Sequence, residues 1–156
     1  MFDCADGSQE DLFDATIDEI VALAVLMPIV ASMGGNAGTQ TLTVVVRALA
    51  MKELTATNAG RLIGKELIVG AINGVVFALL SAVVAWWWFD NPTLGLVIGL
   101  AMIVNMVVAG LAGSSIPLLL ERLGVDPAVA SSVVLTTITD VVGFFVFLGL
   151  AALMML

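Results

Sequence analysis

Four long apolar stretches dominate the sequence and restrict what the chain can fold into. They cover about residues 17–50, 67–89, 93–120 and 128–156. A helix needs about 20 mostly apolar residues to cross the hydrocarbon core of a bilayer, so each stretch is long enough. The chain is 61% hydrophobic and 12% charged, whereas soluble domains carry about 25% charged residues. The sequence therefore predicts an all-α fold, a polytopic membrane helix bundle with four spans.

The basic residues predict how these spans are oriented. Four lie in or beside the loop between the first two spans, and one lies between the last two: Arg47, Lys52, Arg61 and Lys65, then Arg122. Because cytoplasmic loops collect Lys and Arg, we expect both loops inside and both termini of the chain extracytoplasmic. Trp86, Trp87 and Trp88 end the second span, where aromatic residues anchor a helix at the membrane surface.

The composition also excludes several classes of function. The chain has no His and a single Cys, so it lacks the usual ligands of soft transition metals. No pair of nucleophile and base is visible, so we do not expect an enzyme. The net charge of −8 argues against a nucleic-acid partner.

The N-terminal segment is acidic. Residues 1–16 are expected to form an acidic extracytoplasmic segment ahead of a transmembrane, ion-conducting domain over residues 17–156. The acidic side chains around its end either concentrate cations at the outer mouth of a pathway or form only a solvated tail.

Asp140 is the polar residue that most needs an explanation. Asp126 and Pro127 are a favourable N-cap and first position for a helix, which places Asp140 about twelve residues, or roughly 18 Å, along it. A carboxylate near the bilayer centre is costly and marks a functional site by default. We therefore expect Asp140 to face water, a cation or a partner subunit.

A polar stripe passes through this aspartate. Ser132, Thr136, Asp140 and Gly143 recur at steps of four, four and three residues, with Thr139 beside them, which is the spacing of one helix face. The stripe predicts one wall of an aqueous pathway. The alternative for the hydroxyl groups is that they bond back to their own helix and only pack.

The first span carries a second irregular feature. Pro28 is expected to kink it, and Gly34, Gly35 and Asn36 are expected to break it at residues 34–36. Irregular backbone at membrane depth is tolerated where it meets protein or lines a water-filled cavity. The break is therefore expected to present polar groups to the pathway.

Two other polar residues are less specific. Asn105 in the third span is either a bond between helices or part of a polar wall. Glu66 follows Lys65 at the start of the second span, and we expect it to remain at the membrane interface.

Two segments resemble one known family. The stretch PIVASMGGNAGTQTLTVVVRALA closely resembles the signature of the MgtE magnesium channels and transporters, and DPAVASSVVLTTITDVVGFFVFLGLA resembles their last transmembrane helix. The similarity covers roughly residues 17–156. It implies a homodimer of five-span subunits in the bacterial plasma (inner) membrane, with the ion path at the dimer interface.

The resemblance assigns roles to the residues singled out above. The four spans would be the family's helices two to five, with Mg²⁺ as the transported ion. Asp140 would be the pore aspartate, Thr136 would add oxygen ligands beside it, and Asn36 would lie on the facing helix. Gly35, Ser132, Thr139 and Gly143 would also line the pore. The family's cytosolic sensor domains and first transmembrane helix are absent from this sequence, so magnesium-dependent closing is not expected of it alone.

Three functions remain open at this stage. The first is a passive channel that conducts a largely hydrated magnesium ion. The second is an ion-coupled divalent cation carrier on the same scaffold, in which Asp140 also takes up a proton or sodium. The third is a membrane-embedded assembly subunit without flux, whose polar stripes bind partner helices.

Overall fold

The computed structural model describes residues 6–55 and 57–155, and it is helical almost throughout. Four helices follow one another: α1 (Asp6–Ala50), α2 (Ala59–Phe89), α3 (Pro92–Arg122) and α4 (Pro127–Met154). All four are long and apolar enough to cross a membrane, and the described residues contain no strand. The predicted all-α membrane bundle with four spans is confirmed.

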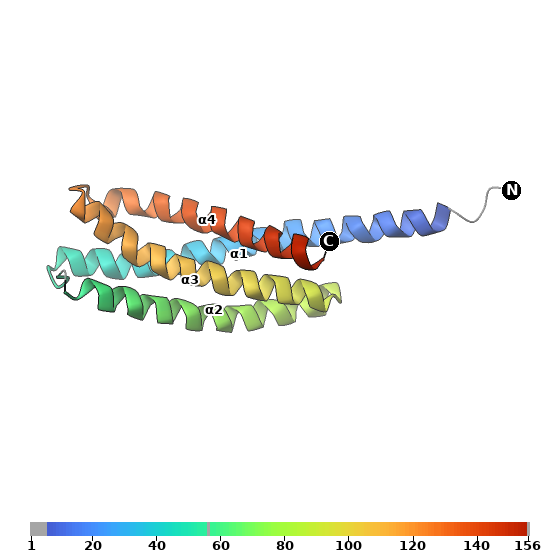
Figure 1. Ribbon diagram of the computed structural model, residues 1–156, viewed down its shortest axis with the longest axis horizontal. Coiled ribbons are helices and arrows are strands. Elements are labelled where there is room, and N and C mark those ends of the chain that lie inside the picture. The colour runs from blue at the N-terminus through green and yellow to red at the C-terminus, as the bar shows by residue number, and fades with distance from the viewer. Residues whose placement is uncertain (1–5, 56, 156) are drawn as a thin grey trace.

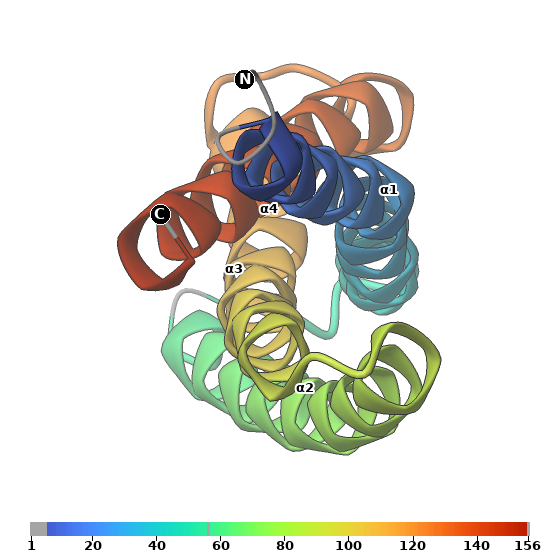
Figure 2. The same ribbon diagram turned by 90° about the vertical axis from the view of Figure 1, so that its right-hand side faces the viewer.

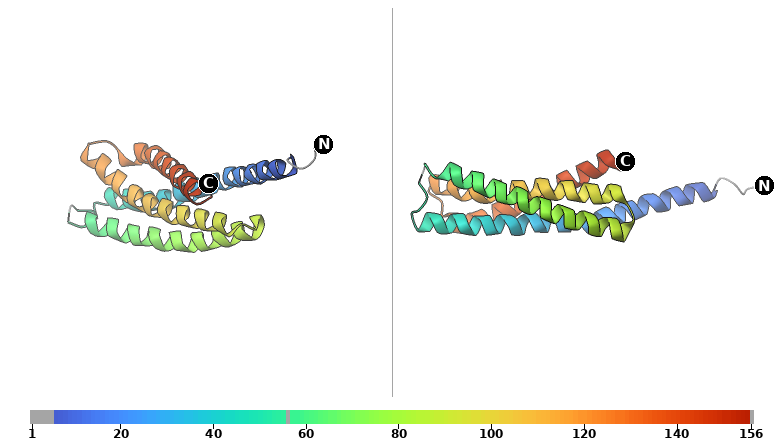
Figure 3. Two further views of the ribbon diagram at one scale, coloured as in Figure 1. Left: turned by 45° about the vertical axis from the view of Figure 1, so that its right-hand side comes forward. Right: turned by 90° about the horizontal axis from the view of Figure 1, so that it is seen from below.

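The helices run up and down, so the loops alternate between the two ends of the bundle (Figure 1). The α1–α2 and α3–α4 loops, which hold or border all the basic residues, lie at one end. The C-terminus and the α2–α3 turn lie at the other end, and the first turns of α1 project beyond the bundle there (Figure 3). The acidic N-terminal segment is thus a helical extension of the first span from Asp6 onward.

Helix α3 is the centre of the bundle. Viewed end-on, it lies between α2 on one side and α1 and α4 on the other (Figure 2). α2 packs almost entirely on α3 and barely touches α1. The outer face of α2 is strongly exposed at Leu79 and Leu80. Because such an apolar face suits hydrocarbon, α2 is expected to be the helix that meets lipid most fully.

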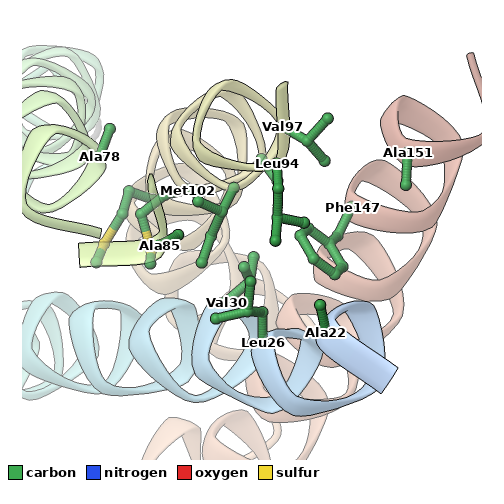
Figure 4. Packing of buried hydrophobic residues seen from close by; sticks show 13 residues of the cluster. Ala22, Leu26, Val30, Ala78, Ala85, Leu94, Val97, Met102, Phe147 and Ala151 are labelled. Atoms are coloured by element: carbon green, nitrogen blue, oxygen red, sulfur yellow. The ribbon is translucent and has the colours of Figure 1, made fainter. Parts of the chain in front are cut away.

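The apolar core joins three helices around α3. Leu94, Val97 and Met102 of α3 meet Val30 of α1 and Phe147 of α4, and each is at most 1% exposed (Figure 4). Lipid is as apolar as these side chains, so their association is driven by close packing rather than by removal from water.

Small residues bring α2 and α3 close together. A β-carbon added to Gly110 of α3 would lie 2.8 Å from the carbonyl oxygen of Glu66, and one added to Gly70 of α2 would lie 2.9 Å from that of Met106. Real β-carbon contacts are longer than this. The two backbones therefore touch only because these positions are glycine.

Helices α3 and α4 each begin with a polar N-cap residue followed by proline. The side chain of Asn91 accepts bonds from the amides of Thr93 and Leu94 at the start of α3. Asp126 accepts one from the amide of Ala128, 2.9 Å away, at the start of α4. In both helices proline holds the first position, where its missing N–H costs nothing.

The predicted break at residues 34–36 is wrong, because α1 is a continuous helix from Asp6 to Ala50. Gly34 is needed for space rather than for flexibility. A β-carbon on Gly34 would lie 2.2 Å from Nδ2 of Asn105, which donates a 2.7 Å hydrogen bond to the carbonyl of Val30. Asn105 is completely buried, so its amide reaches the backbone of α1 only across a glycine.

This packing predicts opposite effects for two adjacent substitutions. Gly34→Ala should destabilise the fold by about 1–3 kcal/mol, because overpacking displaces a buried side chain. Gly35→Ala should be near neutral, since its β-carbon would lie 3.7 Å from its nearest neighbours and alanine favours helix by about 0.5–1 kcal/mol. Melting temperatures in detergent micelles measure both. Equal destabilisation by the two substitutions would contradict this account of Gly34.

Candidate functional site

Helix α4 has a buried seam that repeats every fourth residue. Its members face α1 and α3 and are all buried: Ser131, Leu135, Thr139, Gly143, Phe147 and Ala151. The seam determines which polar residues of α4 are left uncovered.

The predicted polar stripe lies partly in this seam and partly beside it. Ser132 and Thr136 are exposed, and Asp140 is half-buried. Thr139 is completely buried, and a β-carbon on Gly143 would lie 3.0 Å from the side chain of Asn105. The structure thus brings Ser132, Thr136 and Asp140 to one surface of the chain. It places Thr139 and Gly143 between helices.

Helices α1 and α4 meet at the level of Thr136. A β-carbon on Gly35 would lie 3.7 Å from both Thr136 Cγ2 and Thr139 Oγ1, and one on Gly38 would lie 3.0 Å from Leu135. Gly35 is therefore a buried contact position, while Asn36, the next residue, is exposed. The contact places the α1 turn that carries Asn36 beside the α4 turns that carry Thr136 and Asp140.

Together the two helices form an uncovered polar surface, which we call the polar band. It combines the exposed polar residues of the second half of α1 with the uncovered part of the α4 stripe. Its members are Ser32, Asn36, Thr39 and Thr43 of α1 and Ser132, Thr136 and Asp140 of α4. Gln40 is also exposed, but it lines a cavity on the α2 side of α1 instead. A surface of this polarity within two spanning helices is unsuited to hydrocarbon and needs water or protein against it.

The three threonine hydroxyl groups of the band donate to their own helices. Thr136 donates to the carbonyl of Ser132, Thr39 to that of Gly35 at 2.8 Å, and Thr43 to that of Thr39 at 2.8 Å. Each of these three hydroxyls thus bonds back to its own helix, as the packing alternative predicted for the hydroxyls of α4. Its proton is used within the helix, so the group offers oxygen lone pairs to whatever approaches, as a cation requires.

Asp140 lies at the middle of the membrane-spanning length of α4. It is 13 residues past Pro127 in a helix of 28 residues, roughly 20 Å along the axis. Within residues 6–55 and 57–155 no ion pair to Asp140 is found, and no three acidic, Cys or His side chains converge to hold a metal. One chain therefore offers a dication a single carboxylate with neutral oxygens near it.

Glu66 is 91% buried against other helices, and its expected position at the level of the membrane interface stays a prediction. Its Oε2 accepts a 2.9 Å hydrogen bond from Thr41 Oγ1 on α1. The sequence held one signal for this placement: Glu66, Gly70 and Gly74 are spaced by four residues, so the carboxylate shares the glycine face of α2 that packs on α3.

Comparison with known proteins identifies a matching family and three similar proteins. Residues 27–150 match the MgtE family, described as a divalent cation transporter. The chain is 42% identical over 143 residues to the magnesium transporter MgtE of Enterococcus faecalis. It is 36% identical to that of Bacillus subtilis and 35% identical to that of Thermus thermophilus. Each match covers 92–93% of this chain and 32% of the relative, so the chain spans about a third of their length.

The division of α4 into seam and band predicts a pattern of chemical labelling. On a Cys4→Ser background in lipid, Ser132→Cys and Thr136→Cys should react with a membrane-impermeant thiol reagent, because both positions are exposed on the polar band. Ser131→Cys, at a completely buried position, should not react. Phe145→Cys is the lipid-facing control: it is 78% exposed but among apolar neighbours, so water should not reach it. Equal reaction at Thr136→Cys and Phe145→Cys would contradict the pattern.

Proposed function

The chain belongs to the MgtE family of divalent cation transporters, and from this premise we propose that it conducts magnesium as a passive channel in the membrane. The observation that carries the proposal is the position of Asp140. It lies half-buried, halfway along a spanning helix, in a polar band that no other described part of the chain covers. The names of the three relatives, all magnesium transporters, support magnesium as the ion.

We infer that a second copy of the chain covers the polar band. In a symmetric dimer the same patch of both subunits meets across the two-fold axis, so α1 and α4 of each chain would face those of the other. Two Asp140 carboxylates would then lie on opposite sides of one pathway. Exposed polar residues, including Asn36, Ser132 and Thr136, would complete its walls. Gly35 of α1 and the seam residues Thr139 and Gly143 would support them from behind.

The ligands offered suit a hydrated magnesium ion. Magnesium loses water reluctantly and is usually bound through one or two carboxylates while keeping several waters. Two Asp140 carboxylates with neutral hydroxyl and amide oxygens provide this set. Calcium takes six to eight oxygen ligands, more than such a sparse ring supplies.

The basic loops support one orientation in the membrane. Because both lie at the same end of the bundle (Figure 1), we propose that this end is cytoplasmic. The N-terminal extension of α1 would then project from the outer surface, and its exposed Asp14 and Asp18 would attract cations to the entrance.

Asp140→Asn tests the proposal directly. The substitution keeps the shape of the side chain but removes its charge, so the protein should fold and magnesium flux into liposomes should fall at least tenfold. Even in bulk water, one charge about 6 Å from a dication is worth roughly 1.4 kcal/mol, or tenfold. Glu53→Gln, an exposed carboxylate in the α1–α2 loop outside the band, is the matched control and should lose little. Wild-type flux in Asp140→Asn would remove Asp140 from the pathway.

Thr136→Ala should reduce flux much less than Asp140→Asn does. The hydroxyl of Thr136 already bonds to the carbonyl of Ser132, so its removal takes away one neutral oxygen, and the backbone carbonyls of that turn remain. Comparing the two variants in the same flux assay separates charge from neutral ligands. A larger loss of flux in Thr136→Ala than in Asp140→Asn would indicate that the Thr136 hydroxyl, and not the Asp140 carboxylate, is the main ligand.

Disulfide crosslinking tests the dimer. Single cysteines placed at Ser132 and Thr136, on a Cys4→Ser background in lipid, should form intermolecular disulfides because the two α4 helices approach the axis there. Leu79→Cys, 64% exposed on the far side of α2, should not. The arrangement fails if crosslinks form at position 79 and not along α4.

The same liposomes distinguish a channel from a coupled carrier. Channel flux should follow the magnesium gradient and the membrane potential, and it should not change when an imposed pH gradient is collapsed. Flux that requires the pH gradient would favour the carrier.

A further inference from the structure

A second polar site lies between α1 and α2, away from the polar band. It is a cavity of about 330 Å³ whose polar lining comes from Gln40 and Thr41 of α1 and from Lys65, Glu66 and Asn73 of α2. Its floor is α3, at Met106 and Gly110. The cavity exists because α1 and α2 barely touch each other while both pack on α3.

Glu66 is the charged group of this cavity. It is 91% buried, and its single hydrogen bond among the described residues is the one from Thr41. An ionised carboxylate accepts up to about four hydrogen bonds, so most of its capacity is directed into the cavity. No Lys or Arg in the described parts of the chain forms an ion pair with it. A buried carboxylate without a positive partner is costly unless a cation or a proton compensates it.

From this arrangement we propose that the cavity binds a divalent cation with part of its water shell, as a second site distinct from the pathway at Asp140. Its ligands would be the Glu66 carboxylate and the neutral oxygens of Thr41, Gln40 and Asn73, which are the hard donors that magnesium and manganese prefer. Magnesium sites often hold one carboxylate and several waters. Six waters need roughly 180 Å³ at about 30 Å³ each, which the cavity accommodates.

Lys65 is the one basic residue in the lining. Its side chain is exposed, so its ammonium group can stay hydrated although the residue lines the cavity. It still opposes a bound cation. Removing the charge of Lys65 should therefore tighten the site, whereas removing the charge of Glu66 should abolish it. These opposite effects from adjacent residues are specific to a cation bound beside both.

A bound cation would also connect two helices that otherwise share little contact. Ligands from α1 and α2 would hold the pore-lining α1 against α2 at the end of the bundle where the basic loops lie. The binding itself needs no pathway at Asp140, so the site can be tested separately from the proposed channel.

The experiment counts bound Mn²⁺, a paramagnetic substitute for Mg²⁺, on the purified full chain in nanodiscs. Free Mn²⁺ is measured by electron paramagnetic resonance, with Mg²⁺ as competitor. All proteins carry Asp140→Asn, which removes the pore carboxylate. This background should bind one Mn²⁺ per chain that Mg²⁺ displaces. Adding Glu66→Gln should lose that ion, and adding Lys65→Gln should bind it about fivefold more tightly, because one charge about 8 Å from a dication has this effect even in water.

Each outcome decides the proposal. Unchanged Mn²⁺ binding in the Glu66→Gln protein would overturn it, as would Lys65→Gln binding no more tightly than the background. Circular dichroism and gel filtration establish that Glu66→Gln is folded. If Glu66→Gln does not fold, the Mn²⁺ affinity of Lys65→Gln alone tests the proposal, since the Lys65 side chain is exposed and its replacement should not disturb the fold. Loss of flux in Asp140→Asn combined with no second site would retain the channel and reject this inference.

Discussion

The hydrogen bond from Asn105 to the carbonyl of Val30 is the interaction on which the arrangement of the helices depends. Its donor is a completely buried amide on α3, and its acceptor is the backbone of α1. Gly34 and Gly143 flank the amide because a β-carbon on either would approach it to 3.0 Å or less. One polar group thus fixes where three helices meet, and its Oδ1 atom has no partner among the described residues. Such bonds are valuable in lipid, where no water competes for the donor.

Much of the fold could be predicted from the sequence, because the length of an apolar run decides whether it spans a membrane. The structural role of the glycines in the first span could not be predicted. Gly34 and Gly35 fit a broken helix or a tight contact equally well, and only the location of Asn105, 71 residues later in the chain, decides for contact. The burial of Glu66 was not predicted, for a similar reason. Its burial follows from the backbone contact with Gly110 on another helix, which no local pattern reveals.

The candidate site was predictable to within one helix face. Spacing of four residues identified Ser132, Thr136 and Asp140 as one stripe, and all three share a surface. The buried seam of α4 has the same spacing and lies beside this stripe, however, and Thr139 belongs to the seam. Which stripe is covered depends on the crossing of α4 with α1 and α3. The chain consequently has two polar regions of different kinds: the exposed band that contains Asp140, and the half-open cavity in which Glu66 is buried.

The continuity of α1 has a mechanical consequence. With every turn from Asp6 to Ala50 helical, the element is a rod of roughly 67 Å that has no hinge at the level of Asn36. A pathway beside α1 would therefore not widen by unwinding at Asn36. Its width would change when α1 leans or rotates, and Pro28, which removes one backbone hydrogen bond inside the helix, is the position where α1 can bend. Leaning by about 5° around the Asn105 contact at Val30 would move Ala50, 20 residues away, by roughly 2.6 Å. Small displacements at the bundle centre would therefore be magnified at the membrane surface, where the rod ends.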